Sequence, residues 1–280
     1  MIKIAIPNKG QLFEPTVELL TSCGYRLTKT PKSLTCLDPE NNIEFYFLRP
    51  VDIPIYVAAG ILDAGVTGKD FAAEKSVEPT LLVDLHYAQS RLCAAVPKDS
   101  PCTTLAEVAD LQIATSFPEI TRSYFRGKDL QIVTLEGAVE ISVQLGIAEA
   151  IVDVVETGST LDQAGLRVVG EPLFHSNAAL FARPGHESFE EVETLKRRIE
   201  GRMVALEYVM VEYDCPLSLL SRASELTPGI ESPTVSPLQT EGWVAVKAML
   251  KRRESHRIVD ELAKLGCKGV LLMQIEMARI

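Results

Sequence analysis

Short apolar runs alternate with amphipathic segments along the first two thirds of the chain. The runs are rich in Val, Ile and Ala, and turns with glycine, proline or hydroxyl residues bound them, a pattern typical of buried strands. We predict strands at residues 2–6, 43–48, 64–67, 91–96, 112–115, 131–135, 151–155 and 177–181. We predict helices at residues 14–22, 52–59, 105–110, 121–126 and 159–164. Strands that alternate with helices in this way indicate an α/β fold.

A weak internal repeat relates two parts of this pattern. When the sequence is shifted by 86 residues, apolar positions fall on apolar positions and glycine falls on glycine. The matched pairs are Ile53 with Val139, Ile55 with Ile141, Val57 with Val143, Gly60 with Gly146, Ile61 with Ile147, Asp63 with Glu149 and Ala64 with Ala150. The repeat predicts two α/β lobes, each of which sends a strand end into the space between them.

A third pattern begins at Tyr208, after a charged helix predicted at residues 189–202. Its elements follow the order strand, helix, strand, strand, helix, strand, which is the order of a ferredoxin-like domain. The predicted strands are 208–213, 234–237, 243–250 and 269–275, and the predicted helices are 216–223 and 255–265.

These patterns predict three parts. Residues 1–90 with 178–207 form the first lobe, residues 91–177 form the second lobe, and residues 208–280 form a separate C-terminal domain. The chain crosses twice between the lobes, which is typical of a hinged clamshell with its ligand site in the cleft.

The net charge limits the partners of the protein. The 280 residues include 28 Lys and Arg against 38 Asp and Glu, which gives a formal charge of −10. This balance argues against nucleic acid or an anionic membrane as a partner. An anionic substrate needs a local basic site, so individual Lys and Arg residues become informative.

Neither an export signal nor a membrane-spanning run is evident, and we expect a cytoplasmic protein. The cysteines and histidines are widely spread and match neither a disulfide framework nor a zinc site, so we expect reduced thiols. They are Cys23, Cys36, Cys93, Cys102, Cys215, Cys267, His86, His175, His186 and His256.

The most informative stretch is residues 151–161, where an apolar strand ends in a turn rich in hydroxyl groups. Backbone N–H groups, the start of a short helix and the hydroxyls of Thr157, Ser159 and Thr160 can together cradle a phosphate. Asp153 lies on the strand just before this turn, within reach of hydroxyl groups or a magnesium ion beside the phosphate. A buried strand followed by an ordinary capped helix explains the same residues equally well.

Two other strand ends carry lysine and glycine. Lys9 and Gly10 follow the first predicted strand. The segment 65–70 contains the end of the strand predicted at 64–67 and the glycine and lysine that follow it. Open α/β sheets bind ligands at such carboxyl ends. Neither turn has the glycine spacing of a Walker loop.

Several segments, in the same order along the chain, resemble the ATP phosphoribosyltransferase family, whose members catalyse the first step of histidine biosynthesis. They are residues 7–10 (PNKG), 47–53 (FLRPVDI), 65–70 (GVTGKD), the stretch from Glu140 through Gly146 and Asp153 to Leu161, and 226–234 (LTPGIESPT). The resemblance spans the whole chain and points to the long form of the family, which carries a C-terminal regulatory domain.

This resemblance implies a two-lobed core like a type II periplasmic binding protein, with a ferredoxin-like domain that binds an effector. It implies transfer of 5-phosphoribosyl from 5-phosphoribosyl diphosphate to N1 of ATP, with release of diphosphate. It also implies magnesium, held mainly by substrate phosphates, inhibition by histidine, and homo-oligomers that are dimers or hexamers.

The resemblance implies a role for each motif. The turn of Glu156, Thr157, Gly158, Ser159 and Thr160 holds the 5-phosphate. The remaining implied roles are ribose binding by Asp153, diphosphate binding by Lys9 and Arg49, and ATP binding by Lys69, Asp70, Thr115 and the turn 117–121. Positioning and electrostatics can supply most of such a transfer, and no residue qualifies as a general base.

Several of these roles have ordinary alternatives. Arg49 can form a surface ion pair, Asp70 can cap a helix, and Glu156 can be a solvated loop carboxylate. Position 11 departs from the family, because many members have Arg where this chain has Gln11. The positive charge of that arginine is either absent from the site or supplied by another residue, with Arg91 as a candidate.

For the effector, the resemblance implies Asp214, the loop from Ile230 to Thr234, and Gly269. A carboxylate for an amino group and loop N–H groups for a carboxylate suit a free amino acid. A connection stiffened by proline is the alternative for this loop.

Other functions fit parts of the chain. A non-catalytic two-lobed binding protein would explain the two lobes. Such a protein would be expected to carry an export signal, which is not evident in this sequence, and it leaves the phosphate cradle unexplained. A tetrapyrrole-building enzyme needs a cofactor-carrying cysteine in an exposed loop, and no cysteine has that context. An amino-acid sensor explains only the last domain.

Overall fold

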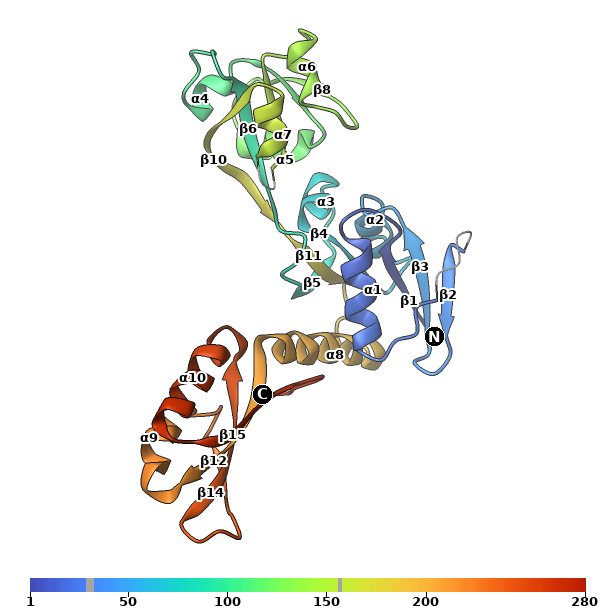
Figure 1. The fold of residues 1–280 in the computed structure, drawn as a ribbon. Helices are drawn as coiled ribbons and strands as arrows, with labels where there is room; N and C mark the ends of the chain where they lie inside the picture. Colours follow the sequence, from blue (N-terminus) through green and yellow to red (C-terminus); the bar gives the residue numbers. More distant parts are fainter. Residues whose placement is uncertain (29–32, 156–157) are drawn as a thin grey trace. The chain divides into compact units, whose positions relative to one another are not determined.

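The computed structural model describes residues 1–28, 33–155 and 158–280 (Figure 1). The described residues form two compact units. The first unit consists of residues 1–18 and 25–193, and the second consists of residues 19–24 and 194–280. The helix α1 (Phe13–Ser22) therefore begins in the first unit and ends in the second.

One sheet of the first unit has six strands in the order β2-β3-β1-β4-β11-β5. The strands are β1 (Ile2–Pro7), β2 (Thr35–Asp38), β3 (Ile43–Leu48), β4 (Ala64–Gly68), β5 (Thr80–Asp84) and β11 (Ala178–Ala182). β1 is parallel to β3 and β4, while β11 is antiparallel to β4. Every residue of β4 and β11 is buried, which explains their unbroken runs of small and apolar residues. The helices α2 (Ile53–Ala58) and α3 (Lys69–Glu74) flank β4 in the chain.

The other sheet of the first unit has five strands in the order β10-β6-β9-β7-β8. The strands are β6 (Ser90–Pro97), β7 (Gln112–Thr115), β8 (Gln131–Thr134), β9 (Ala150–Val155) and β10 (Leu166–Ser176). Its helices are α4 (Leu105–Val108), α5 (Pro118–Tyr124), α6 (Ile141–Gln144) and α7 (Ser159–Gln163). The α/β prediction is confirmed.

The two sheets repeat the same core. The strands β3-β1-β4-β11 of one sheet correspond to β8-β7-β9-β6 of the other, with two parallel pairs followed by an antiparallel pair. The turn before β4 has Ile61 N–H donating to Tyr56 O at 3.0 Å. The turn before β9 has Ile147 N–H donating to Ser142 O at 2.9 Å. The hydrogen bonds thus recur at the spacing of the sequence repeat.

Two connections join the sheets. The chain leaves the six-stranded sheet after β5 to enter β6, and it returns from β10 to β11. β6 and β10 are paired antiparallel, with Ser90 opposite Ser176 where both strands reach the crossing. The crossing segments therefore form a two-stranded ribbon, and both serines line a cavity described below.

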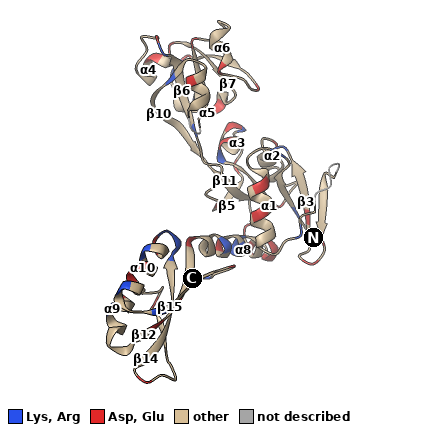
Figure 2. Ribbon diagram, viewed as in Figure 1, with Lys and Arg blue, Asp and Glu red and all other residues tan. Residues whose placement is uncertain are grey.

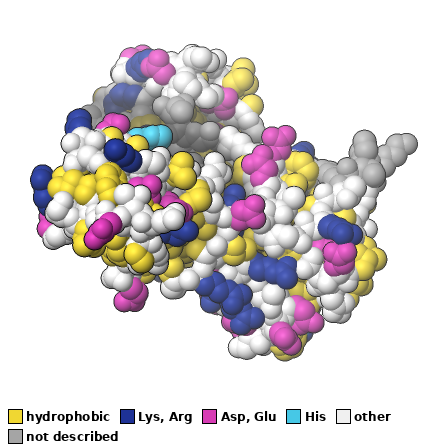
Figure 3. Space-filling model, turned by 60° about the horizontal axis from the view of Figure 1, so that its bottom comes forward, with side chains coloured by type: hydrophobic (Ala, Val, Ile, Leu, Met, Phe, Trp, Pro, Cys, Tyr) yellow, Lys and Arg dark blue, Asp and Glu magenta, His cyan; other side chains and the backbone are white. Residues whose placement is uncertain are grey.

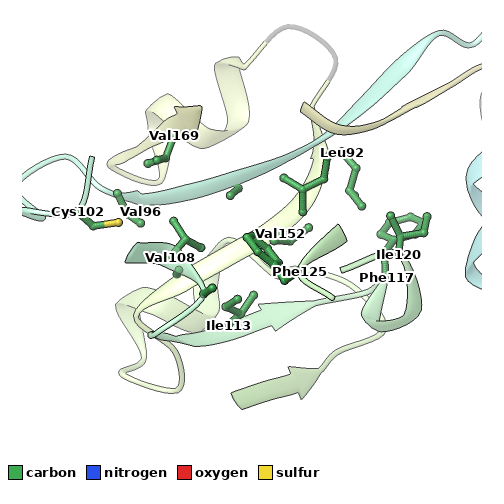
Figure 4. Packing of buried hydrophobic residues seen from close by; sticks show 14 residues of the cluster. Leu92, Val96, Cys102, Val108, Ile113, Phe117, Ile120, Phe125, Val152 and Val169 are labelled. Carbon is green, nitrogen blue, oxygen red and sulfur yellow. The ribbon is translucent and has the colours of Figure 1, made fainter. Parts of the chain in front are cut away.

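The core of the five-stranded sheet is mainly aliphatic and includes the aromatic residues Phe117 and Phe125 (Figure 4). Val152 of β9 lies at its centre, with Ile113 of β7 and Leu92 of β6 beside it. Phe117 and Ile120, from the start of α5, lie together at the edge of this cluster in Figure 4. Burial of apolar surface thus contributes to holding the start of α5.

The second unit contains α8 (Glu190–Glu207) and a four-stranded sheet in the order β13-β14-β12-β15. The strands are β12 (Tyr208–Pro216), β13 (Thr234–Pro237), β14 (Trp243–Lys251) and β15 (Lys268–Gln274). The helices are α9 (Leu220–Leu226) and α10 (Ser255–Leu265), each preceded by a 3-10 turn. The order of elements and of strands is ferredoxin-like, as predicted.

Charged residues of both signs share the same elements. Figure 2 shows acidic and basic residues together on α8 and α10. On the face in Figure 3, acidic and basic side chains are interspersed with uncharged ones. Among the described residues, no helix has both the length and the apolar character needed to cross a membrane.

Candidate active site

Two adjoining cavities lie in the first unit beside the carboxyl ends of its parallel strands. The cradle cavity, of about 400 Å³, is lined by the end of β9 and the start of α7. The apolar cavity, of about 250 Å³, is lined mainly by apolar side chains and is reached by Lys9 and Asp70. Gln11 and Val154 line both cavities. Ligands in the two cavities would therefore meet at these two residues.

The cradle cavity is lined by the described residues of the turn predicted to hold a phosphate. Gly158 precedes α7 with φ +81°, a left-handed conformation that favours glycine. Ser159 and Thr160 line the cavity, while Leu161 is buried and anchors the helix. The predicted residues Glu156 and Thr157 lie outside the described residues.

Two carboxyl groups line the same cavity, those of Asp153 and Glu140. Val154 N–H donates to Asp153 Oδ1 at 2.8 Å. Burial raises the pKa of Asp153 and the like charge of Glu140 raises it further, while the Val154 N–H bond opposes both. Glu140 has no predicted role, and its place at the start of the 140–161 stretch is the one sequence signal that points to it.

Aromatic and aliphatic side chains form the wall of the apolar cavity. Phe71 of α3 and Phe117, next to α5, are stacked with ring centroids 6.3 Å apart. Leu12 is buried beside the turn that follows β1. A mainly apolar cavity with a stacked aromatic pair in its wall suits an aromatic base.

Asp70 is the carboxyl group of the apolar cavity, and it is 8% exposed. Its Oδ1 accepts from Phe71 N–H at 3.0 Å, and its own N–H donates to Ser176 Oγ at 3.0 Å. Burial raises the pKa of Asp70, although hydrogen bonds from Ser176 and Phe71 oppose the shift. A Cβ at Gly68 would lie 2.2 Å from Asp70 Oδ1, so glycine there leaves room for this carboxylate.

Lys69 is held away from the apolar cavity. Its ammonium group forms an ion pair with Asp84, whose Oδ1 also accepts from Asn177 Nδ2 at 3.0 Å. The hydrogen bonds from Lys69 and Asn177 lower the pKa of Asp84. The predicted pair Lys69 and Asp70 therefore splits, with one residue at the crossing and one at the cavity.

The remaining predicted residues vary in position. Lys9 is exposed at the mouth of the apolar cavity. Arg49 is exposed and lies outside the described lining of both cavities, as does Arg91 on β6. Thr115 is buried, and its Oγ1 accepts from Phe117 N–H at 2.9 Å, so it shapes the turn before α5.

The predicted effector residues lie in the second unit. Asp214 of β12 and Gly269 of β15 are adjacent, since a Cβ at Gly269 would lie 3.5 Å from Asp214 Oδ2. Gly269 has φ +58°, which places it in the left-handed region. Thr234 begins the edge strand β13, and Ile230 is exposed in the loop before it. The fold thus brings Asp214 and Gly269 together and leaves the loop at the far edge of the sheet.

Comparison with known families identifies the chain. A family model described as ATP phosphoribosyltransferase matches residues 49–201, which is more than half of the chain. The chain belongs to the ATP phosphoribosyltransferase family. A second model, described as the C-terminal domain of HisG, matches residues 205–277 and fits the long form of the family.

Curated relatives agree over the full length. The ATP phosphoribosyltransferase of Salinibacter ruber is 44% identical over 283 residues, and that of Mycobacterium tuberculosis is 43% identical over 284 residues. Each alignment covers 100% of both chains. The chain is an ATP phosphoribosyltransferase, the enzyme of the first step of histidine biosynthesis, and a non-catalytic binding protein is not favoured.

Solved structures support the same fold. The ATP phosphoribosyl transferase (HisG:HisZ) complex from Thermotoga maritima contains a chain that matches with TM-score 0.61 and 28% identity, covering 71% of this chain and 96% of that chain. The substrate binding protein of an amino acid ABC transporter matches with TM-score 0.50 and 12% identity, covering 74% and 94%. The second likeness concerns the fold alone and confirms the periplasmic-binding-protein-like core.

Phosphoribosyltransferases generally need a divalent metal ion. Within the described parts of the chain, no cluster of three or more His, Cys, Asp or Glu side chains could hold one. Glu140 and Asp153 are the acidic residues of the described cradle lining. Two carboxylates suit an ion that keeps most of its bonds to water and substrate phosphates.

Proposed function

We propose that this ATP phosphoribosyltransferase binds its two substrates in the two adjoining cavities. The cradle cavity takes the ribosyl donor, 5-phosphoribosyl diphosphate, and the apolar cavity takes the adenine ring of ATP. The observation that carries this proposal is the shared lining, since Gln11 and Val154 border both cavities. Adenine N1 and ribose C1 can then meet at the common wall, where the new C–N bond forms as the C1–O bond to diphosphate breaks.

On the donor side, Gly158, Ser159 and Thr160 bind the 5-phosphate, together with Glu156 and Thr157. Asp153 accepts hydrogen bonds from the ribose hydroxyls, and Glu140 assists it from the same cavity wall. Burial of Asp153 supports this role, because a carboxylate with little water around it gains most from hydroxyl donors.

The leaving diphosphate is bound by Lys9 and Arg49. Lys9 is the single cation of the described linings, so the site itself supplies little positive charge to a substrate with two phosphate clusters. We assign the required divalent ion as Mg²⁺, held by the diphosphate with Asp153 and Glu140 nearby. When bound, it neutralises the charge that develops on the leaving group.

On the nucleotide side, Phe71 and Phe117 enclose the adenine ring, and Asp70 accepts from its exocyclic amino group. Asp70 lines the apolar cavity, whereas Lys69 reaches ATP only by leaving Asp84. Thr115 acts by holding the Phe117 turn. Gln11 stands between the substrates as a neutral hydrogen-bonding group where many members have arginine.

In the second unit, histidine binds as the feedback inhibitor. Asp214 receives its amino group, Gly269 leaves space beside that carboxylate, and the loop from Ile230 to Thr234, at the far edge of the sheet, completes the site from another subunit. Subunits assemble as dimers, and as hexamers with histidine bound.

A transfer assay tests the activity. The full chain, supplied with ATP, 5-phosphoribosyl diphosphate and Mg²⁺, should form N1-(5-phosphoribosyl)-ATP and release one diphosphate per product. Chromatography of the nucleotides and a coupled diphosphate assay follow both products. Consumption of donor without a new nucleotide, or no turnover, would contradict the proposal.

A further inference from the structure

The helix α5 begins with a residue that cannot cap it. Phe117 occupies the N-cap position and offers no hydrogen-bonding side chain, and Pro118 follows at the first helical position. The N–H groups of Glu119 and Ile120 thus lack the partner that Ser, Thr, Asp or Asn would supply from the N-cap.

Glu74, at the end of α3, supplies the missing cap. Glu119 N–H lies 3.1 Å from both carboxylate oxygens of Glu74, and Ile120 N–H donates to Glu74 Oε2 at 3.1 Å. The bond joins the helix that follows β4 of the six-stranded sheet to the helix that follows β7 of the five-stranded sheet. It is one of the contacts that hold the two halves of the first unit together.

The same two helices form the aromatic wall of the apolar cavity. Phe71 lies three residues before Glu74, so both side chains leave α3 on one face. Phe71 stacks on Phe117 while Glu74 holds the next turn, and Ile120 beside Phe117 is buried (Figure 4). Thr121 Oγ1 donates to Phe117 O at 2.7 Å, which fixes the turn from the other side.

We propose that Glu74 is a positioning residue for the nucleotide: its carboxylate holds the start of α5 so that Phe117 and Phe71 keep the apolar cavity shaped for adenine. The inference rests on the proposed function, because it takes adenine as the occupant of that cavity. Glu74 does not line the described cavity, so it acts through the two aromatic residues. Weakening the cap should therefore affect ATP and leave the donor in the cradle cavity untouched.

Glu74→Gln in the full chain tests this role. The amide keeps one hydrogen-bond acceptor but places its NH2 group near the N–H groups at the start of α5. The KM for ATP should therefore rise about tenfold, while the KM for the ribosyl donor stays within about twofold. Glu78→Gln is the matched control, because Glu78 is an exposed glutamate just beyond the same helix. ATP binding measured calorimetrically without the donor should show the same loss.

Three results overturn the inference. An unchanged KM for ATP in Glu74→Gln would do so, as would an equal rise of both KM values with a lower unfolding midpoint, which indicates a purely structural cap. If Glu74→Gln does not fold, Glu74→Asp carries the test, since it keeps the charge and draws the carboxylate back from the start of α5; an unchanged KM for ATP in that variant is the third result. An inactive wild-type chain would instead contradict the proposed function itself.

Discussion

At the scale of single residues, the acidic side chains around the cavities favour substrate binding but lower the stability of the folded chain. Burial raises the pKa of Asp70 and of Asp153, so both carboxylates are costly to keep charged in the folded chain. Such a cost is typical of sites that gain a partner only when substrate binds. The ribose hydroxyls and the adenine amino group are those partners in our account.

This cost predicts a pH-dependent gain in stability for Asp153→Asn. A folded-state pKa above the unfolded one means that the wild-type contribution is fully present below the ordinary value of 3.8 and is lost as pH rises through the raised pKa. The variant lacks this loss, so its unfolding midpoint should exceed that of the wild type at pH 7, with the difference shrinking toward pH 4. Calorimetry over this pH range measures it, and a less stable variant at pH 7 would contradict the burial argument.

At the scale of elements, the sequence predicts best where each element carries its own signal. The apolar run of β9 and the helix α7 lie where residues 151–164 predict them, with Gly158 directly before the helix. The order of the ferredoxin-like domain follows for the same reason, because proline or glycine residues separate most of its elements. Asp153 and the described cradle residues could therefore be placed together from sequence alone.

Elements that depend on distant contacts could not be predicted. α5 begins at Pro118, three residues earlier than expected, because Glu74 caps it from 45 residues away. β10 has no predicted counterpart, since Gly170 and Pro172 interrupt its pattern. Its pairing with β6 shifts register between Val169 and Phe174 and so accommodates both residues.

The same limit applies to the site. The ion pair of Lys69 with Asp84 joins α3 to β5, and Asn177 adds a third segment. Nothing local in the sequence separates Lys69, which faces this cluster, from its neighbour Asp70, which faces the apolar cavity. The closeness of Glu140 to Asp153 likewise arises from the fold.

At the scale of the whole molecule, binding and regulation are assigned to different units. Asp214→Asn should raise the histidine concentration for half-inhibition about tenfold or more, because a neutral amide pairs poorly with an amino group, while uninhibited activity stays within about twofold. Glu212→Gln, two residues away on the same strand, is the control.

Removal of residues 208–280 should abolish inhibition and spare some activity. Inhibition that persists in both variants would place the effector in the catalytic cavities.

The measurement that tests the central claim most directly compares Asp153→Asn with Asp70→Asn in the full chain. If the cavities hold separate substrates, Asp153→Asn should raise the KM for the ribosyl donor roughly 100-fold and leave the Kd for ATP within about threefold. Asp70→Asn should weaken ATP binding about tenfold or more and spare the donor. Equal losses for both substrates in each variant, or no loss in either, would contradict the assignment of one cavity to each substrate.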